Sequence, residues 1–480
     1  MKTVLNFIDG KFSEPISGEY LESFDPSTDQ VHLKLADSNA KDVDAAVAAA
    51  SRAYGLWSSL AATERSRYLC KVADLIEQEL DAFALAESQD QGKPVHLAKS
   101  LDIPRAIQNF RFFAGALLHA EDEAIRTDSS TLNVISRKPV GVAGLISPWN
   151  LPLYLLTWKI APALAFGNTV VCKPSEFTSL TAHLLCEVFV KAGLPKGVVN
   201  MVFGSGLGAG DPLVRHPNVP LISFTGGTMT GAAIATAAAP LFKKVSLELG
   251  GKNASIIFDD ADLESAVEQT VRSSFLNQGE ICLCAPRIYV HKQIYSEFME
   301  KFLTQVKALK VGDPRLAVDM GPLVSRAHLE KVESYLALAR EEKAQFLCGG
   351  ARAKVTGRCE KGYFLEPTIL TGVKAESRLQ HEEIFGPIVT ITLFTNENEV
   401  VTLANSTKYG LAATLWTQSL GRAHRLAERL EAGTVWINCW MVRDLRAPFG
   451  GIKGSGLGRE GQKSSREFFT EAKTICIRHG

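Results

Sequence analysis

The sequence predicts an α/β fold with a parallel, doubly wound sheet and a second α/β region. Short apolar runs recur near residues 140–146, 168–172, 198–203, 220–224 and 243–248, separated by roughly ten to fifteen residues of helical periodicity. Strand–helix alternation at this spacing is typical of parallel sheets. A second alternating region runs from about 254 to 450, and 480 residues are too many for one ordinary core.

The first 120 residues precede this regular pattern. Alternating stretches such as residues 31–35 suit edge strands, and helical periodicity follows from about 43 to 118. The most apolar region, 140–172, is interrupted by prolines, asparagines and Lys159. It therefore predicts a buried strand–helix–strand unit and excludes a membrane span. The next helix, about 179–192, ends at Gly193, and Pro195 follows as a stop signal.

The second region begins with a strand over 254–258. Helices are expected near 261–276 and 292–309, and strands near 387–394 and 434–438. Residues 121–139 and 466–480 fit neither region, because both look like extended, alternating segments. Paired with each other, they would make a protruding flap whose edge could bind another subunit. Ordinary edge strands are an equally good interpretation.

Composition narrows the classes of function. Lys plus Arg and Asp plus Glu number 52 each, so no global charge favours nucleic acid or an anionic membrane. Nine scattered cysteines indicate reduced thiols rather than a disulfide framework. Because neither CxxC nor HExxH spacing occurs, no protein-held metal is expected. The first residues lack the apolar run of a signal peptide, which predicts a cytoplasmic enzyme.

A cysteine and a glutamate carry the chemistry. Cys282 follows a stretch that contains Gly279, and Glu248 lies thirty-four residues earlier beside Gly250 and Gly251. A thiolate that attacks a carbonyl and a carboxylate that later activates water are the parts of acyl transfer through a thioester. A lone cysteine is more often a small buried hydrophobic residue, and we interpret Cys284 and Cys439 in that way.

A glycine-containing segment, residues 225–231, lies between a strand and a helix. Glycines there allow backbone N–H groups to approach a phosphate, although many strand-to-helix turns need glycine anyway. Lys173 and Glu176 follow an earlier strand end. An acidic residue at such a site commonly binds ribose hydroxyls and would repel a 2′-phosphate, which favours NAD over NADP. A solvated Lys–Glu pair is the plain alternative.

These residues resemble the aldehyde dehydrogenase superfamily over essentially the whole chain. Seven motifs occur in the family's order and spacing: Pro148-Trp149-Asn150, Lys173-Pro174-Ser175-Glu176, Phe224-Thr225-Gly226, Glu248-Leu249-Gly250-Gly251-Lys252, Cys282, Glu383-Ile384-Phe385-Gly386-Pro387 and Pro448-Phe449-Gly450-Gly451. The resemblance implies a Rossmann-type NAD domain (1–120 and 140–249), a catalytic domain (250–454) and a small oligomerisation flap (121–139 and 466–480). It also implies a homodimer or homotetramer.

The resemblance implies a role for each motif in oxidising an aldehyde to an acid. Cys282 would be the nucleophile, with the Asn150 amide and the Cys282 backbone N–H as the oxyanion hole, and Glu248 would activate water. The residues implied at the cofactor are Ile146, Pro148, Trp149, Lys173, Ser175, Glu176, Gly206, Phe224, Thr225, Gly226, Gly227, Leu249, Glu383 and Phe385. Position 227 is often serine in the family, so glycine here predicts a modest loss of cofactor affinity or a compensating contact.

Two arginines predict the kind of aldehyde. Arg443 and Arg105 fall where the family lines its substrate tunnel, and Asn150 would also touch the substrate. Two guanidiniums in a tunnel cost desolvation energy unless an anion pairs with them, and Arg binds carboxylates bidentately. A substrate with a distant carboxylate is therefore expected. Arg111 and Arg446 are better interpreted as surface or structural ion-pair residues.

Local strings around residues 103–114, 145–154, 277–284 and 438–440 resemble the muconic semialdehyde branch of the superfamily. That branch oxidises 2-aminomuconic or 2-hydroxymuconic semialdehyde, and we favour the amino substrate of tryptophan–kynurenine breakdown. The alternatives are the hydroxy substrate of aromatic catabolism, a broad-specificity or retinal aldehyde dehydrogenase, and a catalytically silent structural homologue. A CoA-acylating enzyme is disfavoured by the retention of Glu248.

Overall fold

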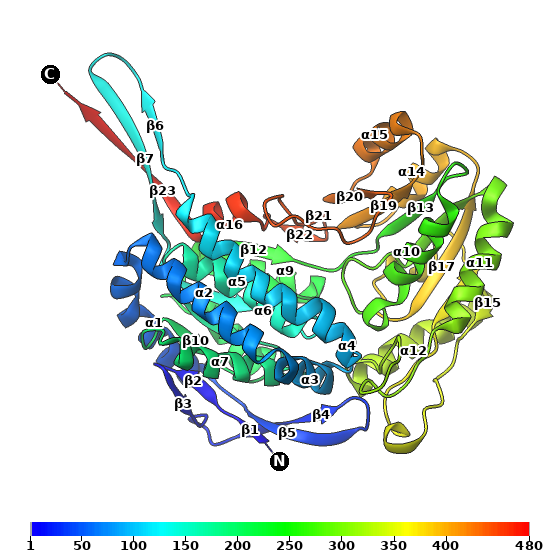
Figure 1. The fold of residues 1–480 in the computed structure, drawn as a ribbon, viewed down its shortest axis with the longest axis horizontal. Coiled ribbons are helices and arrows are strands. Elements are labelled where there is room, and N and C mark those ends of the chain that lie inside the picture. Colours follow the sequence, from blue (N-terminus) through cyan, green and yellow to red (C-terminus); the bar gives the residue numbers. More distant parts are fainter. Residues whose placement is uncertain (1, 480) are drawn as a thin grey trace.

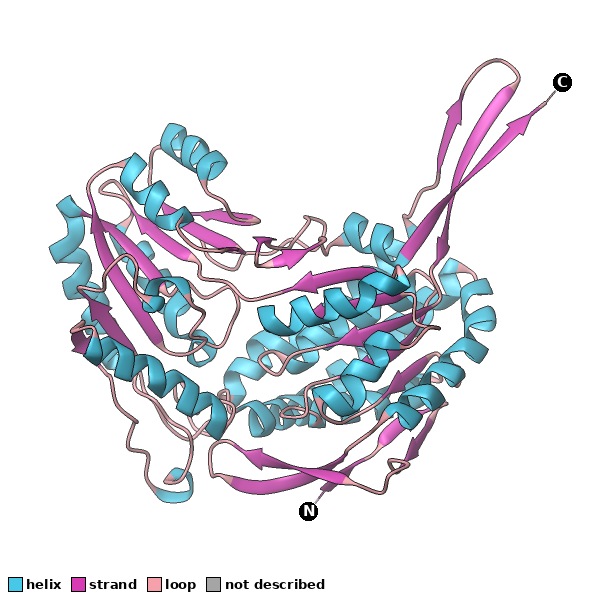
Figure 2. Ribbon diagram, turned by 180° about the vertical axis from the view of Figure 1, so that it is seen from behind, coloured by secondary structure: helices cyan, strands magenta, loops and turns pink. Residues whose placement is uncertain are grey.

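The computed structural model describes residues 2–479 and contains two large sheets covered by helices, with a hairpin flap that projects from the body (Figure 1). Figure 2 shows the same arrangement from behind, with the C-terminal strand running along the flap. The doubly wound α/β fold predicted from the sequence is confirmed. No helix within residues 2–479 is long and apolar enough to cross a membrane.

The first sheet has eight strands in the order β22-β12-β11-β8-β9-β10-β2-β3. Its five central strands are parallel and, counted along the chain, lie in the order 5-4-1-2-3, which is the dinucleotide-binding arrangement. They match the five predicted apolar runs: β8 (Val142–Ile146), β9 (Thr169–Lys173), β10 (Val199–Met201), β11 (Leu221–Thr225) and β12 (Lys244–Glu248). The edges are antiparallel and comprise β2 (Asn6–Ile8), β3 (Lys11–Ser13) and β22 (Gly456–Leu457).

Helices cover both faces of this sheet. The predicted helical region near 43–118 consists of α1 (Ala40–Ser59), α2 (Ala62–Gln78), α3 (Leu80–Gln91), α4 (Val95–Leu97), a π-helix η1 (Ala98–Asp102) and α5 (Ile103–Leu118). The others are α6 (Pro152–Ala165), α7 (Leu180–Ala192), α8 (Asp211–Arg215) and α9 (Thr228–Ala238). Gly193 caps α7 in the left-handed conformation, as its sequence predicts.

The second sheet has the order β15-β16-β17-β14-β13-β19-β20, with only β15 antiparallel to its neighbour. Its strands are β13 (Ala254–Ile257), β14 (Arg287–His291), β15 (Gln345–Cys348), β16 (Thr368–Thr371), β17 (Ile388–Phe394), β19 (Ala412–Trp416) and β20 (Thr434–Ile437). Its helices are α10 (Leu263–Phe275), α11 (Tyr295–Ala308), α12 (Arg326–Glu341), α13 (Arg378–His381), α14 (Glu397–Asn405) and α15 (Leu420–Arg429). The chain passes from the first sheet to the second between Glu248, the end of β12, and Ala254, the start of β13.

Smaller sheets complete the fold. Near the N-terminus, β1 (Lys2–Val4), β5 (Gln30–Ala36) and β4 (Tyr20–Asp25) form one three-stranded sheet. A two-stranded sheet joins β18 (Tyr409–Gly410) to β21 (Ile452–Lys453).

The segments near 121–139 and 466–480 pair with each other in a flap and are not edge strands of the two large sheets. β23 (Thr470–Arg478) pairs antiparallel with β7 (Thr131–Pro139) over nine residues, and β6 (Glu123–Arg126) flanks β7. One part of the prediction is wrong, because residues 466–469 end α16 (Gln462–Phe469) instead of extending the strand. Ser465 and Phe469 lie four residues apart, so the helix buries both on one face.

Candidate active site

Three predicted catalytic residues line one cavity of about 250 Å³ between the two sheets. Asn150 follows β8, Glu248 ends β12, and Cys282 lies on the loop between α10 and β14. The cavity lies at the carboxyl ends of the first sheet's parallel strands, where open α/β sheets bind ligands.

Asn150 is held against the loop that carries the cysteine. Its Nδ2 donates to the carbonyl oxygen of Glu280 at 2.9 Å, two residues before Cys282. A primary amide has two N–H donors, so this bond leaves the second available to an oxygen in the cavity. The backbone carbonyl of Asn150 accepts hydrogen bonds from Lys93 Nζ at 3.0 Å and from Asn277 Nδ2 at 3.2 Å. The predicted oxyanion donor is therefore fixed at both its main chain and its side chain.

The turn before the cysteine is strained. Asn277 and Gln278 have φ of 52° and 57°, and Gly279 has φ of 75°. Left-handed conformations in non-glycine residues cost energy and cluster at functional sites. Side-chain hydrogen bonds hold the turn, because Gln278 Nε2 donates to the Pro322 carbonyl and Gln278 Oε1 accepts from the Gly321 N–H. At Gly279 a Cβ atom would lie 2.4 Å from the Gly386 carbonyl oxygen, so this position excludes a side chain.

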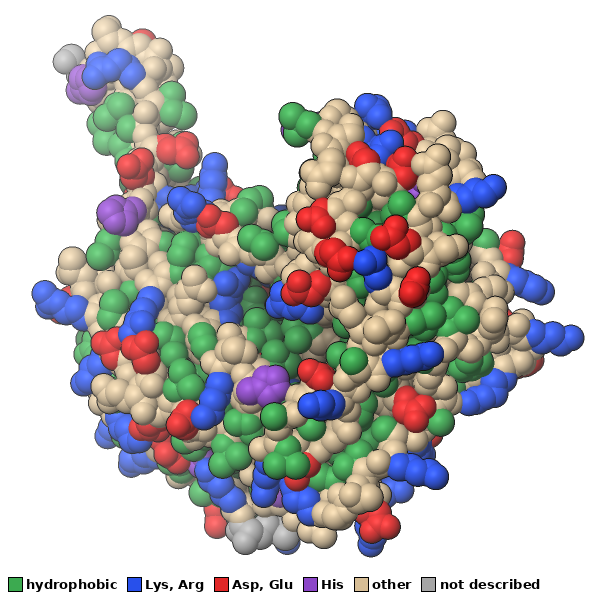
Figure 3. Space-filling view, turned by 45° about the vertical axis from the view of Figure 1, so that its right-hand side comes forward, with side chains coloured by type: hydrophobic (Ala, Val, Ile, Leu, Met, Phe, Trp, Pro, Cys, Tyr) green, Lys and Arg blue, Asp and Glu red, His purple; other side chains and the backbone are tan. Residues whose placement is uncertain are grey.

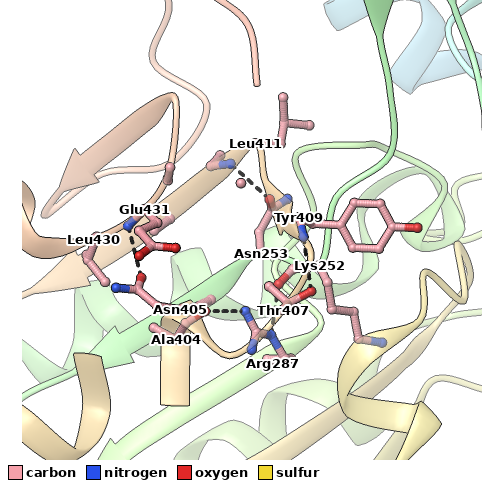
Figure 4. A pocket seen from close by; sticks show the side chains of 15 residues that line it. Lys252, Asn253, Arg287, Ala404, Asn405, Thr407, Tyr409, Leu411, Leu430 and Glu431 are labelled. Carbon is pink, nitrogen blue, oxygen red and sulfur yellow. Dashed lines mark hydrogen bonds between the residues drawn. The ribbon is translucent and has the colours of Figure 1, made fainter. Parts of the chain in front are cut away.

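Asn253 holds the other side of the cysteine, and its role was not predicted from the sequence. Its Nδ2 donates to the carbonyl oxygens of Cys282 and Cys284, both at 2.7 Å. Its Oδ1 accepts from the Ala412 N–H at 3.0 Å, which ties the loop to β19. Figure 4 shows Asn253 among the residues that line a small cavity of about 20 Å³, together with Lys252 and Arg287. That space is about the size of one water molecule.

The environment keeps the Cys282 thiol protonated. Burial raises its pKa far above the ordinary value, the carboxylates of Glu248 and Glu383 raise it further, and the Arg443 guanidinium opposes them. Because the thiolate is the nucleophile, Cys282 must transfer a proton as it reacts.

Glu248 lies in a similar environment. Burial raises its pKa well above the ordinary value, and the nearby Glu460 carboxylate adds to the shift. Glu460 accepts from Trp158 Nε1 at 2.5 Å and lies 3.2 Å from Lys159 Nζ, which also donates to Ser223 Oγ. Glu248 Oε1 is buried without a hydrogen-bond partner. Glu460 and Lys159 were not predicted as site residues, since nothing in the sequence brings 460 near 248.

A second cavity, of about 780 Å³, continues from the first and shares Pro148, Trp149, Thr225, Gly226 and Gly227 with it. It contains the other residues predicted for the adenosine and pyrophosphate end: Ile146, Lys173, Ser175, Glu176, Gly206 and Phe224. Lys173 Nζ contacts Glu176 Oε2 at 2.9 Å at its edge. Leu249, Glu383 and Phe385 line the first cavity.

The residues present fit a dinucleotide. A Cβ atom at Gly227 would meet nothing within 4 Å, so the N-terminus of α9 faces open space where a phosphate could approach. Ser147 Oγ is buried beside the same cavity without a hydrogen-bond partner. Glu383 Oε1 accepts from the Gly251 N–H at 2.9 Å, and a Cβ atom at Gly250 would overlap this carboxylate. Gly250 and Gly251 thus leave room for Glu383, which is predicted to bind the nicotinamide ribose.

His328 and Lys331, from α12, line the first cavity and were missed by sequence reasoning. His328 Nε2 lies 2.7 Å from the Phe385 carbonyl, and the ring packs 5.0 Å from Trp149. Burial lowers the pKa of His328 to about 4, so the neutral ring donates from Nε2. Lys331 Nζ donates to the Glu383 carbonyl at 3.3 Å. Their three-residue spacing puts both on one helix face, but α12 carries no motif that points to a ligand.

The two predicted substrate arginines line one further cavity, of about 500 Å³, with Tyr154 and Met441. The Arg105 guanidinium donates to Gln108 and lies 5.3 Å from the Tyr154 ring centre, while its Nε and Nη2 are buried without partners. The Arg443 guanidinium carbon lies 3.6 Å from the Phe449 ring centre and 5.9 Å from that of Trp158. Within residues 2–479 neither guanidinium forms a salt bridge, but the Arg443 charge acts on Glu248, whose pKa it lowers.

The other two arginines behave differently. Arg111 pairs with Asp74 and Glu77, and Arg446 pairs with Asp444 at 2.6 Å. Both are exposed ion pairs, as the sequence predicts.

Comparisons with known proteins identify the family. The aldehyde dehydrogenase family model matches residues 12–475. The chain is 55% identical to human 2-aminomuconic semialdehyde dehydrogenase, covering 99% of this chain and 98% of that protein. It is 47% identical to a 2-hydroxymuconic semialdehyde dehydrogenase of Pseudomonas sp. strain CF600, covering all of both chains. The structure of the NAD⁺ complex of a Bacillus cereus aldehyde dehydrogenase superposes with a TM-score of 0.97 at 38% identity, covering 100% of this chain and 97% of that one. The chain therefore belongs to the aldehyde dehydrogenase family.

Proposed function

We propose that this protein oxidises 2-aminomuconic 6-semialdehyde to the corresponding dicarboxylic acid with NAD. Family membership makes it an NAD-dependent aldehyde dehydrogenase, and full-length relatives in human and Pseudomonas carry the semialdehyde activity in their names. The observation that carries the substrate class is the pair of guanidiniums, Arg105 and Arg443, that line one cavity without a salt bridge, with two Arg105 nitrogens buried and lacking any partner. 2-Hydroxymuconic semialdehyde is the second candidate, because a named relative of 47% identity acts on it.

The first chemical step belongs to Cys282. Its sulfur attacks the aldehyde carbon, and the developing oxyanion accepts hydrogen bonds from the free N–H of the Asn150 amide and from the Cys282 backbone. Such donors typically contribute about 3–4 kcal/mol each to the transition state. The thiol proton passes to water as the sulfur attacks, and Glu248, which lines the same cavity, stays available as the base of the second step.

Bound NAD would supply the hydride acceptor beside Cys282. The residues that would hold it are Lys173 and Glu176 at one ribose, Glu383 at the other, and the N-terminus of α9 at the phosphates. Phe385 packs edge-on against Trp149 with ring centres 5.3 Å apart, which gives the nicotinamide end an apolar wall.

The second step releases the acid. Loss of hydride leaves a thioester on Cys282, and Glu248 takes a proton from water as the water attacks the thioester carbon. The Cys282 sulfur leaves, recovers a proton, and the carboxylic acid departs. The buried Glu460–Lys159 pair beside Glu248 gives this carboxylate a charged neighbour.

Assembly as a homodimer or homotetramer is part of the proposal. The flap stands clear of the body with hydrophobic side chains along it (Figure 3). Ile125, Ile475 and Ile477 are 54%, 41% and 46% exposed there. An exposed strand edge with apolar side chains is a template for pairing with a second chain.

The test is NADH formation by the purified protein with freshly prepared 2-aminomuconic and 2-hydroxymuconic semialdehydes, beside hexanal, retinal and betaine aldehyde. A preference of about 10²-fold or more in kcat/KM for the semialdehydes is expected, which corresponds to about 2.7 kcal/mol of discrimination. Equal or better turnover of the uncharged aldehydes would refute the carboxylate anchor and leave the cysteine chemistry intact.

A further inference from the structure

A fully buried charge cluster lies behind the substrate cavity. Lys93, between α3 and α4, has a side chain with 0% exposure, and its Nζ contacts Asp102 Oδ1 at 2.7 Å and Glu87 Oε1 at 3.5 Å. The third contact is the carbonyl oxygen of Asn150 at 3.0 Å. Burying an ammonium group is costly unless good partners compensate it, so the cluster constrains all the segments it joins.

One of those segments carries the predicted oxyanion donor. Lys93 Nζ and Asn277 Nδ2 both donate to the Asn150 carbonyl, while the Asn150 amide donates to Glu280. Of these three contacts of Asn150, the one with Lys93 comes from outside the Asn277–Cys282 turn. It therefore sets where the Asn150 loop lies relative to the body of the first domain.

Another segment carries Arg105, which is predicted to bind the carboxylate of the substrate. Asp102 ends the π-helix η1 and is the residue from which α5 starts, with Arg105 in the first turn of α5. Single-turn π-helices are frequent at functional sites. The Asp102 side chain is fully buried, and Lys93 is its cationic partner at 2.7 Å. By fixing Asp102, Lys93 also fixes the start of α5 and the backbone position of Arg105.

Glu87 completes the cluster without adding an uncompensated charge. Burial raises the pKa of Glu87 above its ordinary range, and the neighbouring Asp102 raises it further against the effect of Lys93. A protonated Glu87 leaves one cation and one anion in the cluster. Its Oε2 accepts from the Leu153 N–H at 3.4 Å, which links the cluster to the start of α6 as well.

We propose that Lys93 is a positioning residue that holds the two ends of the substrate site in register, the aldehyde end through the Asn150 carbonyl and the carboxylate end through Asp102 and α5. The Arg105 half rests on the proposed function, whereas the Asn150 half requires only an aldehyde substrate. A displacement of about 1 Å at a positioned group can cost about 10²-fold in rate, so a residue that touches no substrate can control both kcat and KM.

The test variant is Lys93→Met/Asp102→Leu, which removes both charges together and leaves neither one unpaired. Apolar replacement of a buried ion pair is often neutral for stability. We expect kcat with hexanal to fall about 10-fold or more, because Asn150 loses its anchor. With 2-hydroxymuconic semialdehyde, KM should also rise about 10-fold, while KM for hexanal stays within about twofold. Unchanged constants for both substrates in the folded variant would overturn the proposal.

A matched control lies on neighbouring segments, one residue on α3 and one on η1. Lys99 of η1 and Asp81 of α3 form an exposed pair at 2.8 Å, so Lys99→Met/Asp81→Leu removes the same charges from the same segments at the surface. This control should keep both substrates' constants at the wild-type values. Changes equal to those of the buried variant would show that any α3–η1 pair matters and would overturn the specific role of Lys93.

A double-mutant cycle separates positioning from general destabilisation. In an Asn150→Ala background, the buried-pair substitution should lower kcat with hexanal by less than about twofold, because the group it positions is already gone. Losses that multiply would contradict the link to Asn150. If Lys93→Met/Asp102→Leu does not fold, Lys93→Met/Asp102→Asn replaces it in the same cycle, since it also removes the Lys93 contact with the Asn150 carbonyl and leaves no unpaired charge. The same criteria then apply to that variant.

The substrate preference of the wild-type protein distinguishes failure of the proposed function from failure of the positioning role of Lys93. If wild-type protein shows no preference for the semialdehyde over hexanal, the carboxylate anchor fails, yet the hexanal cycle with Asn150→Ala still decides whether Lys93 positions the oxyanion donor. A wild-type preference together with an additive cycle would retain the proposed function and reject the role of Lys93.

Discussion

Substitution of Arg443 by methionine tests the substrate assignment most directly. The guanidinium is half-buried, stacks 3.6 Å from the Phe449 ring centre and lines the cavity that also contains Arg105. Methionine preserves much of the apolar stem and removes the charge. A charge-assisted hydrogen-bonded contact contributes about 1.5–3 kcal/mol. The loss in kcat/KM with a semialdehyde is therefore expected to be about 10- to 150-fold.

The assay is the steady-state rate of NADH formation with 2-aminomuconic semialdehyde and with hexanal, and the quantity that decides is the ratio of the two kcat/KM values. Arg443 also lowers the pKa of Cys282, so its removal affects the thiol with every substrate. Taking the ratio cancels that common effect and isolates recognition of the carboxylate. If the Arg443 guanidinium binds the substrate carboxylate, the ratio of kcat/KM for semialdehyde to that for hexanal falls in Arg443→Met.

Arg446→Met is the matched control. Arg446 lies on the same loop, is exposed and pairs with Asp444, so its loss should change the ratio by less than about twofold. Equal losses with semialdehyde and hexanal in Arg443→Met, or a ratio unchanged within about threefold, would refute the reasoning that the unpaired guanidinium awaits an anion.

The remaining predictions concern the chemistry and the cofactor. Cys282→Ser should abolish turnover, measured as NADH formation, and retained activity would remove the thioester mechanism. Glu248→Ala should allow a burst of NADH and then accumulate acyl-enzyme, visible by intact-protein mass spectrometry; a variant without the adduct would contradict the deacylation role. Glu176→Gln should weaken the preference for NAD, whereas comparable wild-type efficiency with NADP would contradict the ribose contact. The pKa values of Cys282 and Glu248 are both raised and both groups act in their basic forms, so kcat/KM should increase as pH rises from about 6 to about 9. A decline over that range would refute this assignment.

Local patterns predicted the first sheet well. The apolar runs at 142–146 and 221–225 are strands buried over most of their length, and short continuous apolar segments between helices have few other stable arrangements in an α/β protein. Gly193 ended α7 because its left-handed conformation suits glycine. The expectation for 466–469 failed because a short amphipathic helix and an extended strand both bury residues at a four-residue spacing.

Tertiary structure decided which distant side chains share a site. Nothing local indicates that Glu460 lies beside Lys159, that His328 lies against Trp149, or that Lys93 reaches the Asn150 carbonyl. The amino-acid sequence by itself determined the fold class, the family motifs and the two arginines that suggest an anionic substrate. Only the folded chain decided how the flap pairs and which buried charges surround Asn150 and Glu248. The physical reason is that periodicity and turn chemistry act over a few residues, whereas burial, pKa and hydrogen-bond partners depend on contacts between segments far apart in the chain.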